Sequence, residues 1–432
     1  MARLKIAYIG GGSSRAPGTA ATWVAQAENF AGSEIVLIDL DIDRLNLVQR
    51  LATNMARAAG ADLRFTVETS LERGLAGCDA VLTSFRPGGF EARYLDEFLP
   101  LRRGVIGQET QGPGGFFMAL RSIEAIKPIL AAMSRVCPKA WLFNYTNPVN
   151  IVGQAISTYS DIPFVSLCEG PIIFPEMLAR AARLDPAKLD VSMVGLNHGS
   201  WSVRHLHDGE DFIAKISHRL DAIMADPAIH VSDKRMAEIS VNAGSVAAQY
   251  FQYYYYTQEI VKELQASKLT RAQVIMASIP SYWEHYREQA EKDAPMLDPA
   301  LSRGGVNELE LAIDVMDAMF NDRREVWPVN VANQGAIGDF DDDLVVEVPG
   351  FVDRAGIRPL ASGRLPQHVA GLTHALAEFQ RLTAAVGWEG DRRSGIRALA
   401  SNPLVPGFAL AEALYDEMAQ AHRAYLPERL LS

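Results

Sequence analysis

Short apolar runs alternate with amphipathic stretches over roughly the first half of the chain. The runs short enough to be buried strands are Leu4–Ile9, Ser33–Asp39, Cys78–Ser84, Ala140–Asn144 and Phe164–Leu167. Stretches with a helical pattern lie between them, at Thr19–Ala27, Ile123–Val136 and Val149–Tyr159. Because crossovers between neighbouring parallel strands are right-handed and usually helical, this order predicts an α/β fold with a doubly wound, Rossmann-type parallel sheet.

The pattern changes after Leu196. Longer helical stretches are predicted at Lys234–Leu264, Glu308–Asn321 and His368–Ala385, with short strands near Val329–Val331 and Leu344–Val348. We therefore divide the chain into a nucleotide-binding domain, residues 1–196, and a second, mostly helical α+β domain, residues 197–432. No flexible linker or internal repeat separates them, so the expected site is a cleft between two packed domains.

Composition and charge narrow the function classes. The chain has 432 residues, a net charge of -11 and three cysteines. An acidic balance argues against a nucleic-acid partner, and an odd cysteine count argues against a disulfide framework. No apolar run approaches the ~20 residues of a membrane span, and the start of the chain does not resemble a secretory signal. We expect a cytoplasmic protein with no membrane or nucleic-acid partner.

A glycine turn follows the first predicted strand and precedes the first predicted helix. Its members are Gly10, Gly11, Gly12, Ser13 and Ser14. Such a turn can hold a pyrophosphate on backbone amides, although Arg15 replaces the third glycine of the usual fingerprint and glycine turns also serve plain connections. Asp39 ends the second strand, where a carboxylate accepts ribose hydroxyls and repels a 2′-phosphate. The combination predicts NAD rather than NADP.

Cys168 and His198 each follow an apolar run, and both carry groups that bind transition metals. Taken singly, each is more often a packing residue. Taken together, two ligands would leave open positions for substrate oxygens and water, as in a catalytic metal site.

Several polar residues are candidates for ligand contacts. Guanidinium groups match phosphate or carboxylate oxygens, which makes candidates of Arg86, Arg93 and Arg271. Asn144 and Asn147 stand at the end of a predicted strand, although such residues before proline also make turns. A glycine-rich loop at 108–115 could approach a ligand closely or be an ordinary turn. Most of the aromatic run at 250–256 is expected to be packing.

Nine blocks in order along the chain resemble the NAD- and metal-dependent glycosidases of glycoside hydrolase family four. These blocks are Ile9–Ser14, Arg86–Arg93, Gly104–Thr110, Phe143–Pro148, Cys168, Asn197–His198, Tyr250–Tyr255, Thr270–Ala272 and Arg303–Gly305. The resemblance implies glycoside hydrolysis by oxidation at C3 of the sugar, deprotonation at C2, elimination, hydration and reduction. It implies NAD and Mn²⁺ as cofactors.

The resemblance also implies roles for single residues. Cys168 and His198 correspond to the metal ligands and Tyr253 to the base that removes the C2 proton. Glu109 corresponds to the residue that makes this tyrosine more basic, and Glu169 to a proposed leaving-group acid. Contacts to the cofactor are assigned to the glycine turn, Asp39, Arg86 and Asn144, and contacts to the substrate to Arg93, Asn147 and Arg271.

The substrate expected from the resemblance is a 6-phospho-β-glucoside, with Arg271 facing the phosphate. Arg15-Ala16-Pro17 stands where phospho-specific members commonly have Tyr-Thr-Pro, and Glu169 where phospho-β-glucosidases have Asn. A uronide or another unphosphorylated glycoside, cleaved by the same mechanism, therefore stays an alternative. A 2-hydroxy-acid dehydrogenase and a nucleotide-binding regulator are the rivals from other classes. A homodimer or homotetramer is expected.

Overall fold

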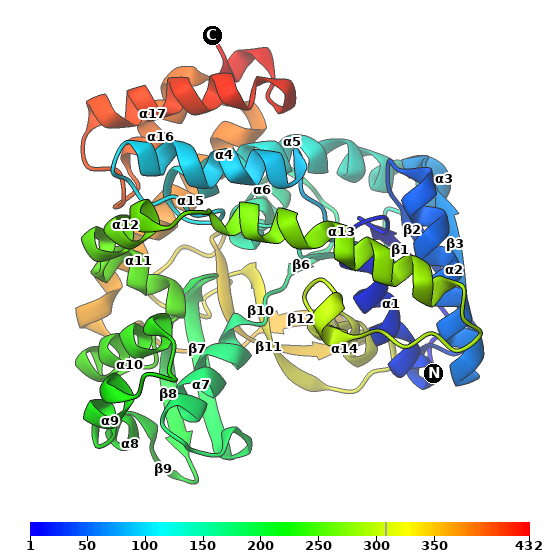
Figure 1. Ribbon diagram of the computed structural model, residues 1–432, viewed down its shortest axis with the longest axis horizontal. Helices are drawn as coiled ribbons and strands as arrows, with labels where there is room; N and C mark the ends of the chain where they lie inside the picture. The colour runs from blue at the N-terminus through cyan, green and yellow to red at the C-terminus, as the bar shows by residue number, and fades with distance from the viewer. Residues whose placement is uncertain (307–308) are drawn as a thin grey trace.

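The computed structural model describes residues 1–306 and 309–432 and contains one continuous mixed sheet (Figure 1). Its strand order is β3-β2-β1-β4-β5-β6-β10-β11-β7-β8-β9, with β12 paired to β11. The first six strands are β1 Lys5–Ile9, β2 Ser33–Ile38, β3 Leu63–Glu68, β4 Ala80–Thr83, β5 Trp141–Asn144 and β6 Phe164–Ser166. The others are β7 Leu189–Leu196, β8 Gly199–His207, β9 Glu210–Asp211, β10 Glu325–Ala332, β11 Val345–Asp353 and β12 Gly356–Pro359.

Helices connect and cover the parallel strands of the first half. They are α1 Ala16–Ala25, α2 Ile42–Ala59, α3 Leu71–Leu75, α4 Gly89–Arg102, α5 Gly112–Val136, α6 Val149–Tyr159 and α7 Gly170–Ala181. Strands β1 to β6 pair in parallel in the order 3-2-1-4-5-6, so the chain reverses direction across the sheet between β1 and β4. This is the doubly wound arrangement that the apolar pattern predicts, and the five predicted strands and three predicted helices of this half are confirmed.

The second half adds antiparallel strands and more helices. The helices are α8 Phe212–Ser217, α9 Leu220–Ala225, α10 Val231–Ala243, α11 Gln252–Tyr255, α12 Thr257–Ala266, α13 Arg271–Ala290, α14 Glu310–Phe320, α15 Gln367–Glu389, α16 Arg392–Ala400 and α17 Phe408–Ala421. In Figure 1, α15 to α17 lie above the sheet at the C-terminal end, and α8 to α10 form a lobe around β7 to β9. The predicted strands near Val329 and Leu344 are β10 and β11.

One long helix predicted in the second half is wrong. The stretch Lys234–Leu264 is divided into α10, a short aromatic segment with α11, and α12. Gly244 ends α10 in the left-handed conformation, with φ 62°, and Ala247 then forms a bridge to Trp201. Tertiary pairing with β8 therefore overrides the helical pattern. The predicted helix Glu308–Asn321 is α14, although its first residue lies outside the described part of the chain.

Sequence reasoning also missed the β7–β8 hairpin. The two strands pair antiparallel, with Leu196 opposite Gly199 across a turn formed by Asn197 and His198. The predicted boundary between residues 196 and 197 falls inside this turn, and the domain division stays a prediction. No helix in the described residues is long and apolar enough to span a membrane.

A buried charged network attaches α17 to α4 and α5. The Arg121 guanidinium donates to both carboxylate oxygens of Asp96, at 2.9 and 2.6 Å, and His422 Nε2 lies 3.0 Å from Asp96 Oδ1. All three side chains are fully buried. Burial raises the pKa of Asp96, but Arg121 and His422 outweigh that effect and hold the pKa below its ordinary value. The carboxylate is therefore charged and fixes the helices that carry the neighbouring site.

Candidate active site

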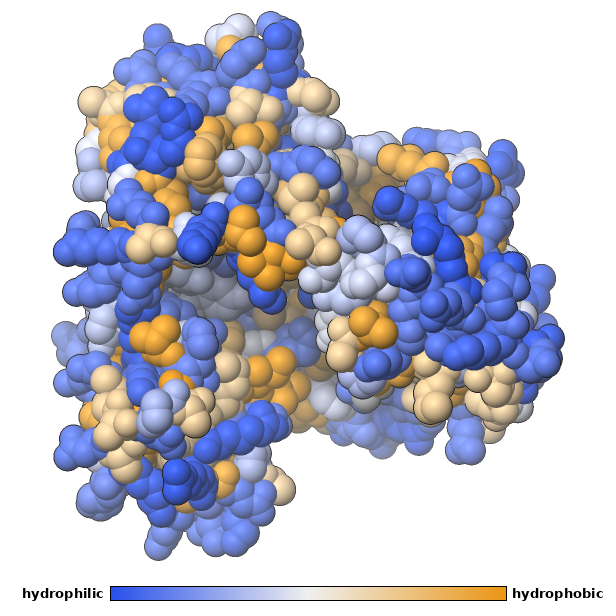
Figure 2. All heavy atoms as spheres, viewed as in Figure 1, coloured by the Kyte–Doolittle hydropathy of each residue, from blue (hydrophilic) through white to orange (hydrophobic). Residues whose placement is uncertain are grey.

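The candidate residues gather where the parallel strands end. The carboxyl ends of β1, β4, β5 and β6 are neighbours in the sheet and are followed by the glycine turn, Arg86, Asn147 and Cys168. In open α/β sheets ligands bind outside these ends, near the point where the strand order reverses. Figure 2 shows the molecule hollowed between the half that contains β1 to β3 and the lobe that contains α8 to α10.

The glycine turn is shaped by close backbone contacts. Gly10 has φ 102°, and a Cβ atom on it would lie 2.2 Å from Ser84 O at the end of β4. A Cβ on Gly12 would lie 3.0 Å from the Asp39 side chain, and Gly12 N donates to Asp39 Oδ2 at 2.9 Å. Only glycine fits at Gly10, because both the positive φ and the contact exclude a side chain. Asp39 therefore lies against the turn, and its contact with the ribose of a dinucleotide stays a prediction.

The remaining members of the turn lead into α1. Ser13 N donates to Gly10 O at 3.0 Å, and Ser13 Oγ is buried with no hydrogen-bond partner among the described residues. Ser14 O accepts a hydrogen bond from the Tyr286 hydroxyl at 3.0 Å. A buried hydroxyl without a partner is costly. It indicates a ligand atom at this point of the turn.

Cys168 and His198 meet, although 30 residues separate them. Cys168 Sγ lies 3.7 Å from His198 Nε2. Cys168 follows β6, and His198 occupies the β7–β8 turn with φ 62°. Among the residues that the structure describes, no third His, Cys, Asp or Glu completes a cluster that could hold a metal ion. A pair of this kind suits an open site with free coordination positions.

Thr110 fixes the histidine tautomer. Thr110 Oγ1 lies 3.2 Å from His198 Nδ1 and 3.0 Å from Gln108 Oε1. Gln108 Oε1 also accepts from the backbone N–H groups of Thr110 and Gln111, at 2.5 and 2.8 Å, so it is an acceptor and takes the Thr110 proton. His198 Nδ1–H must then donate to Thr110, which leaves the Nε2 lone pair facing Cys168. Sequence reasoning missed Thr110, since nothing in the sequence pairs it with His198.

The protonation of the pair follows from burial. Burial lowers the pKa of His198 to about 3, so its ring is neutral near pH 7. Burial, together with the negative charges of Glu347 and Glu169, raises the pKa of the Cys168 thiol to about 12. A divalent cation would reverse this shift, because it stabilises the thiolate.

Two tyrosines of the aromatic run lie near the pair. The Tyr250 ring stacks on the His198 ring, with centroids 3.6 Å apart and planes 6° apart. The Tyr253 ring is 6.2 Å from Tyr250. Burial, together with the negative charge of Glu109, raises the pKa of Tyr253 to about 12. Burial also raises the pKa of Tyr250 well above 10. The structure thus brings Tyr250 onto a metal-ligand candidate, a contact absent from the sequence-based assignment to Tyr253.

Glu109 is the centre of an arginine cluster. Arg86 Nη2 lies 2.6 Å from Glu109 Oε2, and Arg93 Nη1 lies 2.9 Å from Glu109 Oε1. Burial raises the pKa of Glu109, but Arg86 and Arg93 outweigh burial and hold the pKa below its ordinary value. Arg93 also pairs with Glu97 at 2.7 Å. Glu109 is therefore a carboxylate whose negative charge raises the pKa of Tyr253, and its role in catalysis stays a prediction.

The remaining candidates differ in what they contact. Glu169 Oε1 accepts from the Tyr145 hydroxyl at 2.7 Å, which orients its carboxyl group next to Cys168. Asn144 is fully buried, and its amide bonds Thr83 and Ser166 at 3.0 and 2.9 Å. These bonds join the ends of β4, β5 and β6. They favour a positioning role for Asn144 over the predicted cofactor contact, which stays untested.

Arg271 and Asn147 lie at the edge of the site. Arg271 is exposed and begins α13, and the next residue, Ala272, donates its N–H to Glu97 Oε2 at 2.8 Å. This bond places the start of α13 beside the Glu97–Arg93 pair. Asn147 follows β5 and is partly buried, and its carbonyl accepts from Ser122 Oγ at 2.9 Å. Both remain candidates for substrate contacts.

The predicted loop at 108–115 is a loop only as far as residue 111, because Gly112 to Gly115 form the first turn of α5, and the whole stretch is tightly packed. A Cβ on Gly114 would lie 2.2 Å from Gln108 O and 2.6 Å from Asp96 O, and a Cβ on Gly115 would lie 2.4 Å from Thr110 C. The glycines thus allow the first turn of α5 to pack closely against α4 and the preceding loop. This packing holds the backbone of Glu109 and Thr110 in place at the site.

A second missed group is a buried carboxylate behind the His198 turn. Glu347 on β11 accepts from Asn197 Nδ2 at 3.0 Å and from Ser200 Oγ at 2.8 Å. It is 1% exposed, and burial raises its pKa to about 7. No motif identifies it, because it sits in an ordinary apolar strand pattern.

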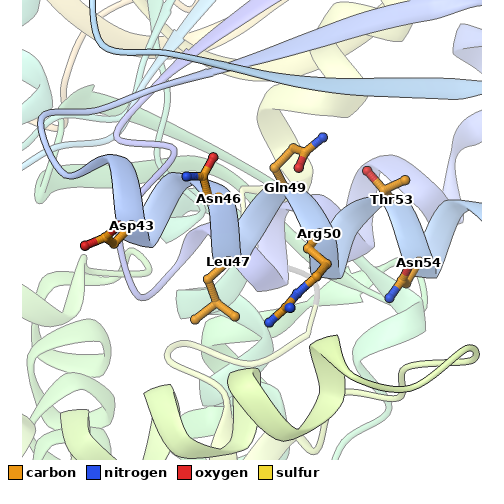
Figure 3. A pocket seen from close by; sticks show the side chains of 7 residues that line it. All are labelled: Asp43, Asn46, Leu47, Gln49, Arg50, Thr53 and Asn54. Atoms are coloured by element: carbon orange, nitrogen blue, oxygen red, sulfur yellow. The ribbon is translucent and has the colours of Figure 1, made fainter.

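A groove on the outer face of α2 lacks this chemistry (Figure 3). All of its lining residues belong to α2, and they are Asp43, Asn46, Leu47, Gln49, Arg50, Thr53 and Asn54. Their side chains leave the helix on two sides and do not converge on one point. The carboxyl edge of the sheet is therefore the better candidate site.

Comparison with known proteins identifies relatives over the whole chain. A probable 6-phospho-beta-glucosidase of Bacillus subtilis is 34% identical over 438 aligned residues, which cover 98% of each chain. A 6-phospho-alpha-glucosidase of Leptotrichia buccalis is 27% identical and covers 99% of each chain. The 6-phospho-beta glucosidase of Thermotoga maritima, solved with manganese, NAD+ and glucose-6-phosphate, is 25% identical, with a TM-score of 0.85 over 98% of this chain and 99% of that one.

Family models agree with these relatives. The model described as "Family 4 glycosyl hydrolase" matches residues 5–184, and the model described as "Family 4 glycosyl hydrolase C-terminal domain" matches residues 193–405. These matches confirm the resemblance seen in the nine sequence blocks. The chain therefore belongs to the family 4 glycosyl hydrolases.

Proposed function

We propose that this glycosidase hydrolyses 6-phospho-β-glucosides with NAD and a divalent metal, of which Mn²⁺ is the expected ion. The observation that carries the proposal is the meeting of Cys168 and His198 at 3.7 Å on the sheet edge that also bears the glycine turn. Relatives named as 6-phospho-glucosidases, and one solved with manganese, NAD+ and glucose-6-phosphate, support it. Family membership favours a glycosidase over a 2-hydroxy-acid dehydrogenase.

The residues present fit both cofactors. The glycine turn Gly10–Ser14 joins β1 to the start of α1, and the Ser13 hydroxyl is buried without a partner among the described residues. These features suit a pyrophosphate. The neutral His198 Nε2 and the Cys168 sulfur face each other and suit a transition metal. When bound, NAD supplies a reversible hydride acceptor for C3 of the sugar, and the metal supplies a Lewis acid for its C2 and C3 oxygens.

The side chains divide the proton transfers. A tyrosine oxygen removes the proton from C2, which oxidation at C3 has made acidic, and Glu109 increases the basicity of that tyrosine through its negative charge. Glu169, oriented by the Tyr145 hydroxyl, protonates the departing glycosidic oxygen. Arg93, Asn147 and Arg271 orient the sugar, and Asp39 accepts the ribose hydroxyls. Water is consumed and the cofactor is regenerated.

Contacts favour Tyr250 over Tyr253 as the C2 base, because Tyr250 stacks directly on His198. The Tyr253 ring reaches this candidate metal ligand only through the Tyr250 ring. We expect Tyr250→Phe to abolish exchange of the C2 hydrogen with solvent and Tyr253→Phe to retain it. The measurement is deuterium incorporation at C2 during turnover in deuterated water. The reverse order would return the role to Tyr253.

The substrate class is tested by a panel of aryl glycosides assayed with NAD and Mn²⁺. Turnover of a 6-phospho-β-glucoside, with catalytic NAD and no net NADH release, is the expected result. Preference for a glucuronide or galacturonide would favour the alternative in which an arginine pairs with a C5 carboxylate. Stoichiometric NADH release without aglycone release would contradict the glycosidase mechanism.

We further propose that the enzyme is a cytoplasmic homodimer or homotetramer. Three apolar side chains in the stretch from α11 to α13 are exposed, Tyr255 by 49%, Leu269 by 50% and Val274 by 42%. Exposed apolar groups near a site are common in subunit interfaces. Light scattering coupled to size-exclusion chromatography checks the assembly, and a mass of one chain would contradict it.

A further inference from the structure

An arginine that no part of the proposed mechanism uses belongs to the cluster around Glu109. Arg303 follows the short turn Pro299–Leu301, and its guanidinium lies over the Phe90 ring at 5.1 Å. Arg86 lies over the same ring at 5.8 Å. Two guanidinium groups therefore contact one phenyl ring at the edge of the site.

The Arg303 segment is attached to the glycine turn. The Tyr286 hydroxyl donates to Ser14 O at 3.0 Å and accepts from Arg303 N at 2.9 Å. One side chain of α13 thus joins the backbone of the two segments. This connection holds Arg303 next to the point where a pyrophosphate is expected.

Arg303 is poorly compensated within the described residues. Its Nη1 atom is buried and makes no hydrogen bond there. Burial, together with the positive charges of Arg15, Arg86 and Arg93, lowers its pKa to about 10. The opposing carboxylate, Glu109, already pairs with Arg86 and Arg93. A buried donor among like charges costs free energy unless an anion is bound.

We propose that Arg303 binds a phosphate group of the enzyme's ligand, with Arg15 adding positive charge from the glycine turn. Two sources supply this chemistry, the pyrophosphate of the dinucleotide and the 6-phosphate of the sugar. A phosphate suits the position because it carries more charge than a carboxylate and offers several oxygens to a guanidinium fork. The inference rests on the proposed function for the presence of these ligands at the site.

Calorimetric titration of three variants tests the proposal. NAD is titrated alone, and glucose 6-phosphate and glucose are titrated into NAD-saturated protein. Arg303→Ala removes the guanidinium, and Arg303→Lys keeps the charge but loses the fork. Arg358→Ala is the matched control, because Arg358 also lies over a phenyl ring, that of Phe351 at 5.2 Å, and stands on β12. Thermal melting of each variant checks that it is folded.

We expect Arg303→Ala to raise the Kd of a phosphate-bearing ligand about 10- to 100-fold, the range for loss of one charge-assisted hydrogen bond. The Kd of Arg303→Lys is expected to lie between those of wild type and Arg303→Ala. The Kd of Arg358→Ala is expected to stay within about twofold of wild type. If the affinity for glucose 6-phosphate falls while the affinity for glucose stays unchanged, Arg303 binds the sugar phosphate. If the affinity for NAD falls, Arg303 binds the pyrophosphate.

Unchanged affinity for both NAD and glucose 6-phosphate in a folded Arg303→Ala protein overturns the proposal. An equal loss of affinity for glucose and glucose 6-phosphate, with the affinity for NAD unchanged, also overturns the proposal, because the effect would then not involve phosphate. Since these are binding measurements, they are independent of turnover. A wild-type protein that cleaves no phosphoglycoside, yet loses NAD affinity with Arg303→Ala, contradicts the proposed function and supports this inference.

Discussion

The hydrogen bond from His198 to Thr110 is expected to orient His198 for metal binding with Cys168, and a substitution at Thr110 tests this. Thr110→Val replaces the hydroxyl by a methyl group of similar size and removes the acceptor for His198 Nδ1–H. The proton on Nδ1 is then left without its partner at 3.2 Å in a site where His198 is 7% exposed. The tautomer that directs the Nε2 lone pair toward Cys168 Sγ loses its advantage.

The size of the effect follows from two estimates. An unsatisfied buried donor costs about 1–3 kcal/mol. Loss of the hydrogen-bond partner of a metal-bound histidine typically weakens metal affinity by about 10- to 100-fold, which corresponds to about 1.4–2.7 kcal/mol. The two ranges agree. We therefore expect the Kd of Mn²⁺ to rise about 10- to 100-fold in Thr110→Val.

The assay is titration of Mn²⁺ into NAD-saturated protein, followed by the electron paramagnetic resonance signal of free Mn²⁺. Thr110→Ser is the matched control, because it keeps the hydroxyl that bonds Gln108 and His198. It should bind Mn²⁺ within about threefold of wild type, well below the effect of losing the partner. Equal affinities of wild type and a folded Thr110→Val, or equal losses in both variants, would refute the tautomer argument.

Three further predictions concern other buried groups. Cys168→Ser should weaken Mn²⁺ binding by more than the ~100-fold expected for loss of the hydrogen-bond partner of a metal-bound histidine. NAD affinity, measured by fluorescence titration, should change little. Burial raises the pKa of Glu347 to about 7 from 4.5. Its favourable contribution to folding stability is therefore present below pH 4.5 and is lost as the pH rises through 7. In urea unfolding, the free energy of unfolding of wild type should fall by up to ~3 kcal/mol relative to that of Glu347→Gln between pH 4.5 and 8. Parallel pH profiles of the unfolding free energy of the two proteins would contradict this. Asp96→Ala leaves Arg121 buried without its partner and should cost ~3–5 kcal/mol in urea unfolding, against ~0–1 kcal/mol for Glu291→Ala in an exposed pair.

The first half of the fold could be predicted because its information is local. A buried parallel strand is a short apolar run, and its length and neighbours are visible in the sequence at Leu4–Ile9 and Phe164–Leu167. The second half could not, because tertiary contacts override local pattern there. The segment after α10 pairs with Trp201, and that pairing interrupts a stretch with a continuous helical pattern.

The site divides in the same way. The sequence supplied the candidates for the chemistry: the glycine turn, the thiol of Cys168, the imidazole of His198 and the carboxylate of Glu109 stand in recognisable blocks, and Asp39 ends a predicted strand. The contacts that these side chains make depend on the folded chain. Stacking of Tyr250 on His198 joins residues from different elements, and so does the hydrogen bond from His198 to Thr110.

The physical reason is the range of the interactions. A turn conformation or a strand end depends on residues that are neighbours in the chain, so its signature is written in consecutive positions. A hydrogen bond such as that between Glu347 and Asn197, 150 residues apart, depends on how separate strands pack into one sheet. No single segment contains that information, because the contact exists only after the chain has folded.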